Sequence, residues 1–148
     1  MADTVRRVTL QPAGGALGYV ESLLERNDLP AADVRSKPDC VYVASADGDR
    51  IGAGGIERYG TDGLLRSLVV ERSARGNGYG TAIRAALEAE ARLDGIETLY
   101  LLTTTATEFF ATTGYTRIDR SEAPDPVRNT TEFADLCPAS ATCMRKLL

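Results

Sequence analysis

The sequence has 148 residues, enough for one domain of ordinary size, and we expect residues 1–148 to fold as a single domain. Its 17 basic and 21 acidic residues give a net charge of −4, and it has no run rich in Lys or Arg, which argues against a nucleic-acid partner. It contains no histidine, which excludes a Ser-His-Asp triad, a Cys-His pair and any metal site built on histidine. Any chemistry must therefore use carboxylates, hydroxyls, thiols, backbone amides or a cosubstrate.

The cysteines indicate a reducing compartment for the protein more than they indicate a metal-binding or disulfide site. Cys40, Cys137 and Cys143 are odd in number and form no Cys-x-x-Cys pair, which favours free thiols in a reducing cytoplasm. Thiolates bind soft metals and arsenic, but no third thiol lies near Cys137 and Cys143, so we expect structural burial and no metal. The chain has no apolar leader and no apolar run of the length of a membrane span, which predicts a cytoplasmic protein with no membrane partner.

In the first half of the chain, the pattern predicts a strand, a helix and three sequential antiparallel strands. Residues 4–10 are strand-like, and Leu17, Val20 and Leu24 recur with helical spacing. Glycine-rich turns at 47–49 and 60–63 separate the later strands, because glycine adopts positive φ without steric cost. These strands are predicted over residues 40–46, 51–59 and 64–70.

In the second half, a helix is predicted over residues 80–93, with Gly95 as its C-terminal cap. Its small residues Ala82, Ala86, Ala89 and Leu93 are predicted to lie against a sheet, with Arg84, Glu88 and Arg92 on the opposite face. The apolar run 99–102 is typical of a central strand. Beyond it, the pattern predicts a helix over 106–113, a strand over 115–120, a helix near 130–136 and a strand over 141–148.

The most informative stretch is residues 64–81, LLRSLVVERSARGNGYGT, an apolar strand followed by a glycine-rich turn into a helix. Gly76, Gly78 and Gly80 allow backbone N–H groups to gather at a helix N-terminus, which attracts an anion such as pyrophosphate. No Gly-Lys-Ser/Thr follows, and Thr81 stands where a dinucleotide fold has its third glycine. The glycines alone also fit a merely flexible loop.

Two motifs carry a family resemblance. Arg75, Gly78 and Gly80 match the signature Arg/Gln, two residues, Gly, one residue, Gly/Ala, and residues 106–115, ATEFFATTGY, look like the segment A-x-x-x-Y-x-x-x-G-F. In this order they resemble the GNAT superfamily of acetyl-CoA-dependent N-acetyltransferases. The resemblance implies an α/β (α+β) fold with a mixed, mostly antiparallel, splayed seven-stranded sheet and helices on both faces.

The resemblance also implies an activity. Residues 99–105 are similar to a strand end of amino-acid N-acetyltransferases, and the tail 132–144 looks like that of N-acetyltransferases associated with arsenic-resistance operons. This implies acetyl transfer from acetyl-CoA to the primary amine of a small amino-acid-like molecule, an organoarsenical amino acid being one candidate. The alternatives are a catalytically silent acetyl-CoA-binding module and a protein N-terminal acetyltransferase. A homodimer is compatible with the family.

Residue by residue, the resemblance implies that the backbone of the strand pairs with the pantetheine arm and that the following loop holds the pyrophosphate. Phe110 stands where the family often has a general-acid Tyr, so it has no proton to give; it would pack against the thioester end, and solvent would protonate the thiolate. The strand residues are Leu68, Val69 and Val70, and the loop residues are Arg75, Gly76, Asn77, Gly78, Tyr79, Gly80 and Thr81.

Three further residues are candidates for the acceptor site. An amine must be neutral to attack a thioester, so a carboxylate is the expected base when histidine is absent, and we select Glu57 in its Gly/Ala/Ile segment. A solvated edge charge is the competing interpretation. Arg66 interrupts an apolar strand and could bind a substrate carboxylate with Ser67 nearby, or form a structural ion pair. Glu71 and Glu108 are interpreted as surface charges.

Overall fold

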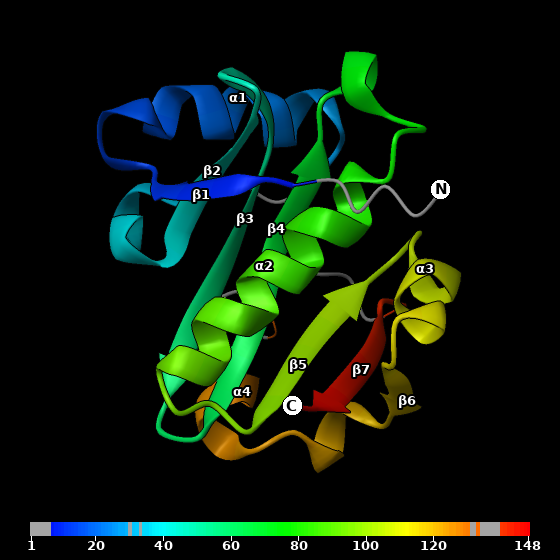
Figure 1. Ribbon diagram of the computed structural model, residues 1–148. Helices are drawn as coiled ribbons and strands as arrows, with labels where there is room; N and C mark the ends of the chain where they lie inside the picture. Colours follow the sequence, from blue (N-terminus) through cyan, green and yellow to red (C-terminus); the bar gives the residue numbers. More distant parts are fainter. Residues whose placement is uncertain (1–6, 30, 33, 131–132, 134–139) are drawn as a thin grey trace. The chain divides into compact units, whose positions relative to one another are not determined.

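Seven strands form one sheet in the computed structural model, which describes residues 7–29, 31–32, 34–130, 133 and 140–148 (Figure 1). The strand order is β1-β2-β3-β4-β5-β7-β6. The strands are β1 (Thr9–Pro12), β2 (Val41–Ala46), β3 (Asp49–Tyr59), β4 (Asp62–Val70), β5 (Thr98–Thr103), β6 (Thr116–Ile118) and β7 (Thr142–Leu147), and the helices are α1 (Leu17–Arg26), α2 (Tyr79–Leu93), α3 (Thr107–Thr112) and α4 (Asp125–Arg128).

The sheet is mixed, as predicted. β4 runs parallel to β5, while the pairs β1–β2, β2–β3, β5–β7 and β6–β7 are antiparallel. The register between β4 and β5 covers Asp62 to Leu64 opposite Thr98 to Tyr100, although β4 continues to Val70. The predicted fold class is therefore confirmed. None of the helices in the described part of the chain is long and apolar enough to cross a membrane.

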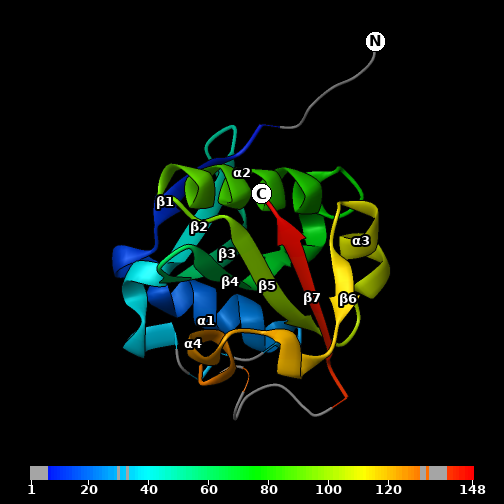
Figure 2. The same cartoon turned by 90° about the horizontal axis from the view of Figure 1, so that it is seen from below.

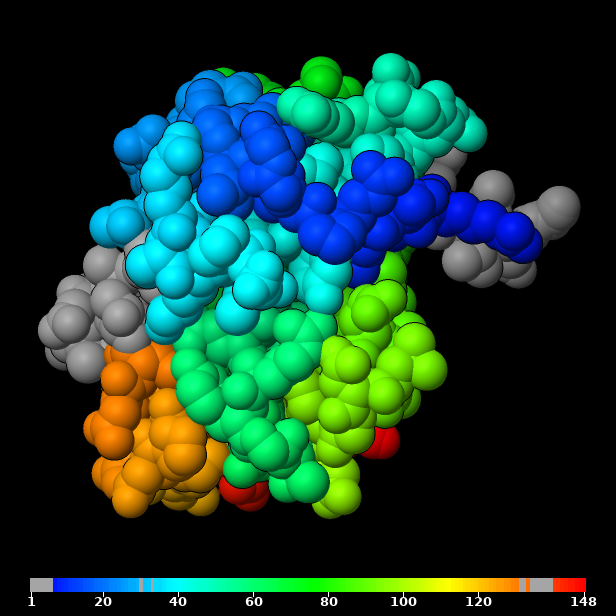
Figure 3. Space-filling model, turned by 90° about the vertical axis from the view of Figure 1, so that its left-hand side faces the viewer, coloured from blue at the N-terminus to red at the C-terminus, as the bar shows by residue number. Residues whose placement is uncertain are grey.

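Contacts divide the chain into two compact units. The first unit comprises Met1–Gly55 and Ser67–Glu90, and the second comprises Ile56–Arg66 and Ala91–Leu148. Strands β3 and β4 and helix α2 each continue from one unit into the other. In the first unit, β1 and the turns between α1 and β2 lie side by side on one face, where Figure 3 shows them in blue and cyan.

The first unit has helices on both faces of its strands (Figure 2). Val20, Leu23 and Leu24 of α1 are fully buried against a cluster that includes Ala53 of β3 and Val69 of β4. On the other face, Gly52 and Gly54 of β3 meet helix α2: a Cβ on Gly54 would lie 2.5 Å from Leu87 Cδ1, and one on Gly52 2.9 Å from Ile83 Cδ1. The absence of side chains at both glycines lets α2 approach the strand closely.

The predicted sheet-facing side of α2 is wrong. The helix buries Ile83, Leu87 and Ala91, whereas Leu93 is 81% exposed. Large apolar side chains bury more area than alanines do, so they decide which side of the helix packs. Arg84 and Glu88, predicted to face away from the sheet, form a buried ion pair at 2.7 Å.

The second unit has its own core. Leu64 of β4 packs with Tyr100 of β5, Val127 of α4 and Cys143 of β7. The predicted cap of α2 is confirmed: Gly95 has φ +82°, and the Ile96 amide donates to the Ala91 carbonyl at 3.0 Å.

Several element boundaries differ from the prediction. β1 begins at Thr9 and includes Pro12, which an edge strand tolerates because it has a partner strand on one side only and alternate N–H groups point away from that partner. β4 begins at Asp62, so the turn before it is only residues 60–61, with Gly60 at φ +66°. The strand predicted over 115–120 is confined to β6. Most of the helix predicted near 130–136, as well as residues 4–6 and Cys137, lies outside the described residues.

Candidate active site

A buried ion pair joins β3 and β4 within the second unit. Arg66 Nη1 donates to Glu57 Oε2 at 2.6 Å, and both side chains are only 2% exposed. Away from water, such a charge-assisted bond is stronger than the same pair at the surface. Glu57 is therefore no solvated edge charge. The structure brings together the residue predicted as base and the residue predicted to bind a carboxylate.

Tyr59 completes a network around Glu57. Its hydroxyl donates to Glu57 Oε1, so each carboxylate oxygen holds one of the two partners. Glu57 and Tyr59 are two residues apart on β3, and side chains at that spacing share one face of a strand. The Tyr59 ring is half-buried and packs against the core cluster of the second unit. The sequence analysis missed Tyr59, although this two-residue spacing was a signal for it.

Ser67 follows Arg66 in an unusual backbone conformation. Its φ is +58° in the middle of β4, a left-handed geometry that residues with a Cβ rarely adopt. An irregularity of this kind in a strand interrupts the alternation of its two faces and redirects backbone groups. Such strained residues gather at functional sites. Ser67 is half-buried.

The glycine-rich loop leads directly into helix α2. Gly76 and Gly78 both have φ +81°, and α2 begins at Tyr79. The Ala82 amide donates to the Gly78 carbonyl at 3.1 Å, four residues earlier. The amides before Ala82 lie too early in the helix to make such a bond within it. The Asn77 amide nitrogen donates to the Ala74 and Arg75 carbonyls at 3.0 and 3.2 Å, which shapes the loop.

Space around this loop suits an anion. A Cβ on Gly76 would meet no atom within 4 Å, and residues 75–78 are exposed. Amides at a helix N-terminus, together with the positive end of the helix dipole, attract negative charge. The residues present therefore fit the predicted pyrophosphate cradle.

The Arg75 side chain fastens the loop to two other elements of the first unit. Its Nε donates to the Val70 carbonyl at 3.3 Å, at the end of β4. Its Nη2 donates to Asn27 Oδ1, and the Asn27 amide nitrogen donates to the Leu23 carbonyl at 2.8 Å. Asn27 therefore bridges the last turn of α1 and the loop. The sequence pattern gave no signal for this contact between distant segments.

Glu71, interpreted as a surface charge, is partly exposed and serves as a second fastening point. The Tyr19 hydroxyl of α1 donates to Glu71 Oε2 at 2.8 Å, and Arg26 Nη1 lies 3.5 Å from Oε1. Burial raises the pKa of Tyr19, and the hydrogen bond to Glu71 and its charge raise it further. The Arg50 guanidinium lies 4.9 Å from the Tyr19 ring centre. Glu108, by contrast, is exposed as expected.

Phe110 belongs to an aromatic cluster of the second unit. It is 6% exposed, and its ring makes edge contacts with Phe109 at 5.0 Å and Tyr115 at 5.4 Å between ring centres. The other predicted cosubstrate residues, 68–70 and 75–81, belong to the first unit.

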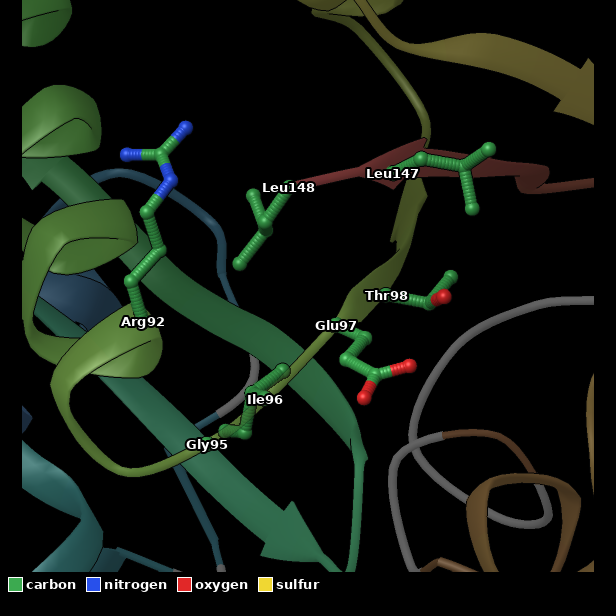
Figure 4. A pocket seen from close by; sticks show the side chains of 7 residues that line it. All are labelled: Arg92, Gly95, Ile96, Glu97, Thr98, Leu147 and Leu148. Carbon is green, nitrogen blue, oxygen red and sulfur yellow. The ribbon is translucent and has the colours of Figure 1, made fainter.

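A separate hollow of about 490 Å³ lies in the second unit, where α2 ends and β5 begins (Figure 4). Its lining is Arg92, Gly95, Ile96, Glu97, Thr98, Leu147 and Leu148. None of the predicted site residues lines it. Among the residues that the structure describes, no group of three acidic or cysteine side chains is placed to hold a metal.

Comparisons with known proteins identify the family of the chain. The Acetyltransferase (GNAT) domain family matches residues 37–117, more than half of the chain. The chain therefore belongs to the GNAT acetyltransferase family. No curated protein matches the sequence significantly.

Solved structures share the fold at low sequence identity. N-acetylglutamate synthase from Neisseria gonorrhoeae, complexed with coenzyme A and L-arginine, is 20% identical with a TM-score of 0.79 and covers 97% of this chain. This chain spans only 34% of that protein. Rv2747 from Mycobacterium tuberculosis, in complex with CoA and NLQ, is 22% identical with a TM-score of 0.77, over 95% of this chain and 99% of its own. An acetyltransferase from Streptococcus agalactiae is 14% identical with a TM-score of 0.72, over 97% and 100% of the two chains.

Proposed function

We propose that this protein, acting as one acetyltransferase domain over residues 1–148, moves an acetyl group from acetyl-CoA to the primary amine of a small amino-acid-like molecule. The observation that carries the acceptor class is the buried pair of Glu57 and Arg66, whose opposite charges lie 2.6 Å apart. An amino acid holds a carboxylate and an ammonium group on one carbon. The arginine complements its carboxylate, and the glutamate complements its ammonium group.

Binding of the cosubstrate is assigned to the strand and loop of the first unit. Acetyl-CoA supplies the acetyl group as a thioester. The backbone of Leu68, Val69 and Val70 pairs with the pantetheine arm, and the loop from Arg75 to Thr81 holds the pyrophosphate. Gly76 and Gly78 support this assignment, because both are exposed and have a left-handed backbone, and a Cβ on Gly76 would meet no atom within 4 Å. The structures of N-acetylglutamate synthase and Rv2747 were both solved with coenzyme A, which supports it further.

Glu57 is proposed to take the proton from the acceptor amine. In the unliganded pair, the Arg66 guanidinium favours the ionised carboxylate and weakens it as a base. A substrate carboxylate that binds Arg66, with Ser67 beside it, shares that positive charge and strengthens Glu57 as a base. Since both side chains are 2% exposed, neighbouring side chains must move to admit the substrate. Acceptor binding and activation of the base are therefore coupled.

Phe110 has no proton to donate, so the departing thiolate takes its proton from solvent. The ring is proposed to pack against the thioester end of the cosubstrate, as an extension of its aromatic cluster.

Within the amino-acid class, we propose an organoarsenical amino acid as one acceptor. Its support is the resemblance of residues 132–144 to arsenic-resistance-associated acetyltransferases. Residues 132 and 134–139 of that tail lie outside the described part of the chain. Two complexes of one similar enzyme, N-acetylglutamate synthase, support the broader class, since one holds L-arginine and the other N-acetyl-glutamate. Release of the coenzyme A thiol is measured with an arsenical amino acid and with its arsenic-free isostere. Faster release with the arsenical would support the organoarsenical acceptor, and equal release with both would support only the broader amino-acid class.

The experiment that tests the acceptor class uses matched amines on the native protein. An amino acid and its decarboxylated amine are compared by the release of the coenzyme A thiol. A bidentate contact with Arg66 contributes roughly 1.5–3 kcal/mol, so we expect kcat/KM to be about ten- to a hundredfold higher for the amino acid. The Arg66→Lys variant keeps the positive charge but loses the two parallel N–H donors of the guanidinium, so it should lose most of that preference. Equal rates for both amines would contradict the assignment, and a protein that releases no thiol with any amine would favour a silent module.

Glu57 is tested by its pH dependence. Gln at position 57 keeps an oxygen for Arg66 but cannot take a proton, so Glu57→Gln should lower turnover at neutral pH while binding of coenzyme A is unchanged. The loss should shrink as pH rises and the amine deprotonates without help. Glu108→Gln, at an exposed glutamate, is the matched control. A defect of equal size at every pH would assign Glu57 to the fold alone.

A further inference from the structure

Tyr59 lies next to the buried ion pair and is itself only partly buried. The side chains of Glu57 and Arg66 are each 2% exposed, whereas Tyr59 is half-buried. The phenol hydroxyl already contacts Glu57 Oε1. A proton that reaches Glu57 therefore has a hydroxyl group next to it, on a residue that is partly exposed.

We propose that Tyr59 carries the proton of the acceptor amine from Glu57 to solvent. This inference rests on the proposed function and adds a residue to it. Without such an exit, a protonated and buried Glu57 would have to wait for the site to open before it could act again.

The transfer balances without a further reactant. The amine nitrogen gives one proton to the Glu57 carboxylate, which becomes a neutral acid. The Glu57 O–H then donates to the Tyr59 oxygen while the Tyr59 hydroxyl proton passes to a water molecule. Glu57 returns to its ionised form beside Arg66, Tyr59 stays neutral, and one proton has entered the solvent.

The groups around Tyr59 allow this path to be read from a pH profile. On its own strand it faces Glu57, and the core cluster that it packs against contains two further titratable groups, Tyr100 of β5 and Cys143 of β7. Burial raises the pKa of Tyr100, and it raises the pKa of Cys143 to about 11. Both therefore stay uncharged at neutral pH. The charged groups that act on these two are Asp62 and Arg145 for Tyr100, and Arg120, Glu122 and Asp119 for Cys143.

The test is Tyr59→Phe, which removes the hydroxyl and keeps the ring. We expect kcat for the amino-acid acceptor to fall about tenfold at neutral pH, a fraction of the 10²–10⁴ that acid–base catalysis supplies as a whole. KM for both substrates should stay within about twofold, because Tyr59 is proposed to carry the amine's proton and to contact neither substrate. The defect should vanish at high pH, where the amine is already neutral. Tyr100→Phe, which removes a phenol from the same core cluster, should leave the profile unchanged.

A double variant separates a proton path from a structural role. If Tyr59 acts through Glu57, then Tyr59→Phe should cause no further loss of kcat in a Glu57→Gln background. An equal loss in both backgrounds, a defect of equal size at every pH, or an unchanged kcat would each overturn the inference while the acetyltransferase proposal stands. A native protein that acetylates no amine would overturn both.

Discussion

Removing the positive partner of the buried ion pair should destabilise the fold strongly. Arg66→Met leaves Glu57 as a charge with 2% exposure and no cation at 2.6 Å. Breaking a buried pair in this way costs about 3–5 kcal/mol, because the remaining charge has lost both water and its partner. At about 2–4 °C per kcal/mol for a chain of this size, the melting temperature should fall by roughly 6–20 °C.

An exposed pair gives the comparison. Arg35 lies 2.9 Å from Glu21, but its side chain is 65% exposed. Surface pairs of this kind contribute about 0–1 kcal/mol, so Arg35→Met should change little. The Glu57→Leu/Arg66→Met double variant should recover most of the stability, since replacing both charges leaves no uncompensated charge in the core.

Urea unfolding followed by circular dichroism measures these differences. The penalty of Arg66→Met should shrink as pH falls, because protonation of Glu57 removes the orphaned charge. If Arg66→Met lost no more stability than Arg35→Met, or if the double variant were as unstable as the two single changes added together, the argument from burial would be refuted.

Three further predictions concern single positions. Gly52→Ala should cost about 1–3 kcal/mol in urea unfolding, because its Cβ would lie 2.3 Å from the Val69 carbonyl oxygen, whereas Gly15→Ala, with no atom within 4 Å, should be tolerated. Gly78→Val should abolish coenzyme A binding in calorimetry, because it strains a backbone at φ +81° and covers the loop amides; unchanged affinity would contradict the pyrophosphate assignment. Burial raises the pKa of Cys143 to about 11, so stability should fall as pH rises from about 8.5 toward 11, where the unfolded thiol ionises first, and Cys143→Ala should flatten that slope; an identical slope in the variant would assign it to other groups.

Local patterns were sufficient for much of the fold. The turn at Asp47 and Gly48, the helix over Leu17 to Arg26 and the cap at Gly95 all depend on residues close together in sequence, and the structure confirms each of them. The glycine-rich loop was found for the same reason. Its chemistry depends on a short stretch of backbone that the sequence shows directly.

Contacts between distant segments were harder to predict. Arg66 and Glu57 were each selected singly, but their pairing depends on the hairpin that places β4 beside β3. Tyr59 was missed because an aromatic residue in a strand is more often core than part of a polar network. The packing side of α2 was predicted wrongly because the prediction rested on the narrow stripe of alanines and not on the larger Ile83. The two glycines against which this helix packs lie on β3, far from it in the sequence.

Helix α1 holds the glycine-rich loop from a distance in sequence. Tyr19 and Arg26 contact Glu71, and Asn27 contacts Arg75. Brief fraying at the end of α1 therefore frees the loop that the helix holds, and a ligand seated on the ordered loop favours the unfrayed helix by mass action. The amide protons of Asn27 and Leu29, which bond to the Leu24 carbonyl at 3.0 Å, should then exchange with solvent more slowly when the loop is occupied. Hydrogen exchange at the C-terminal end of α1 thus shows whether a ligand is bound to a loop that lies some fifty residues further along the chain.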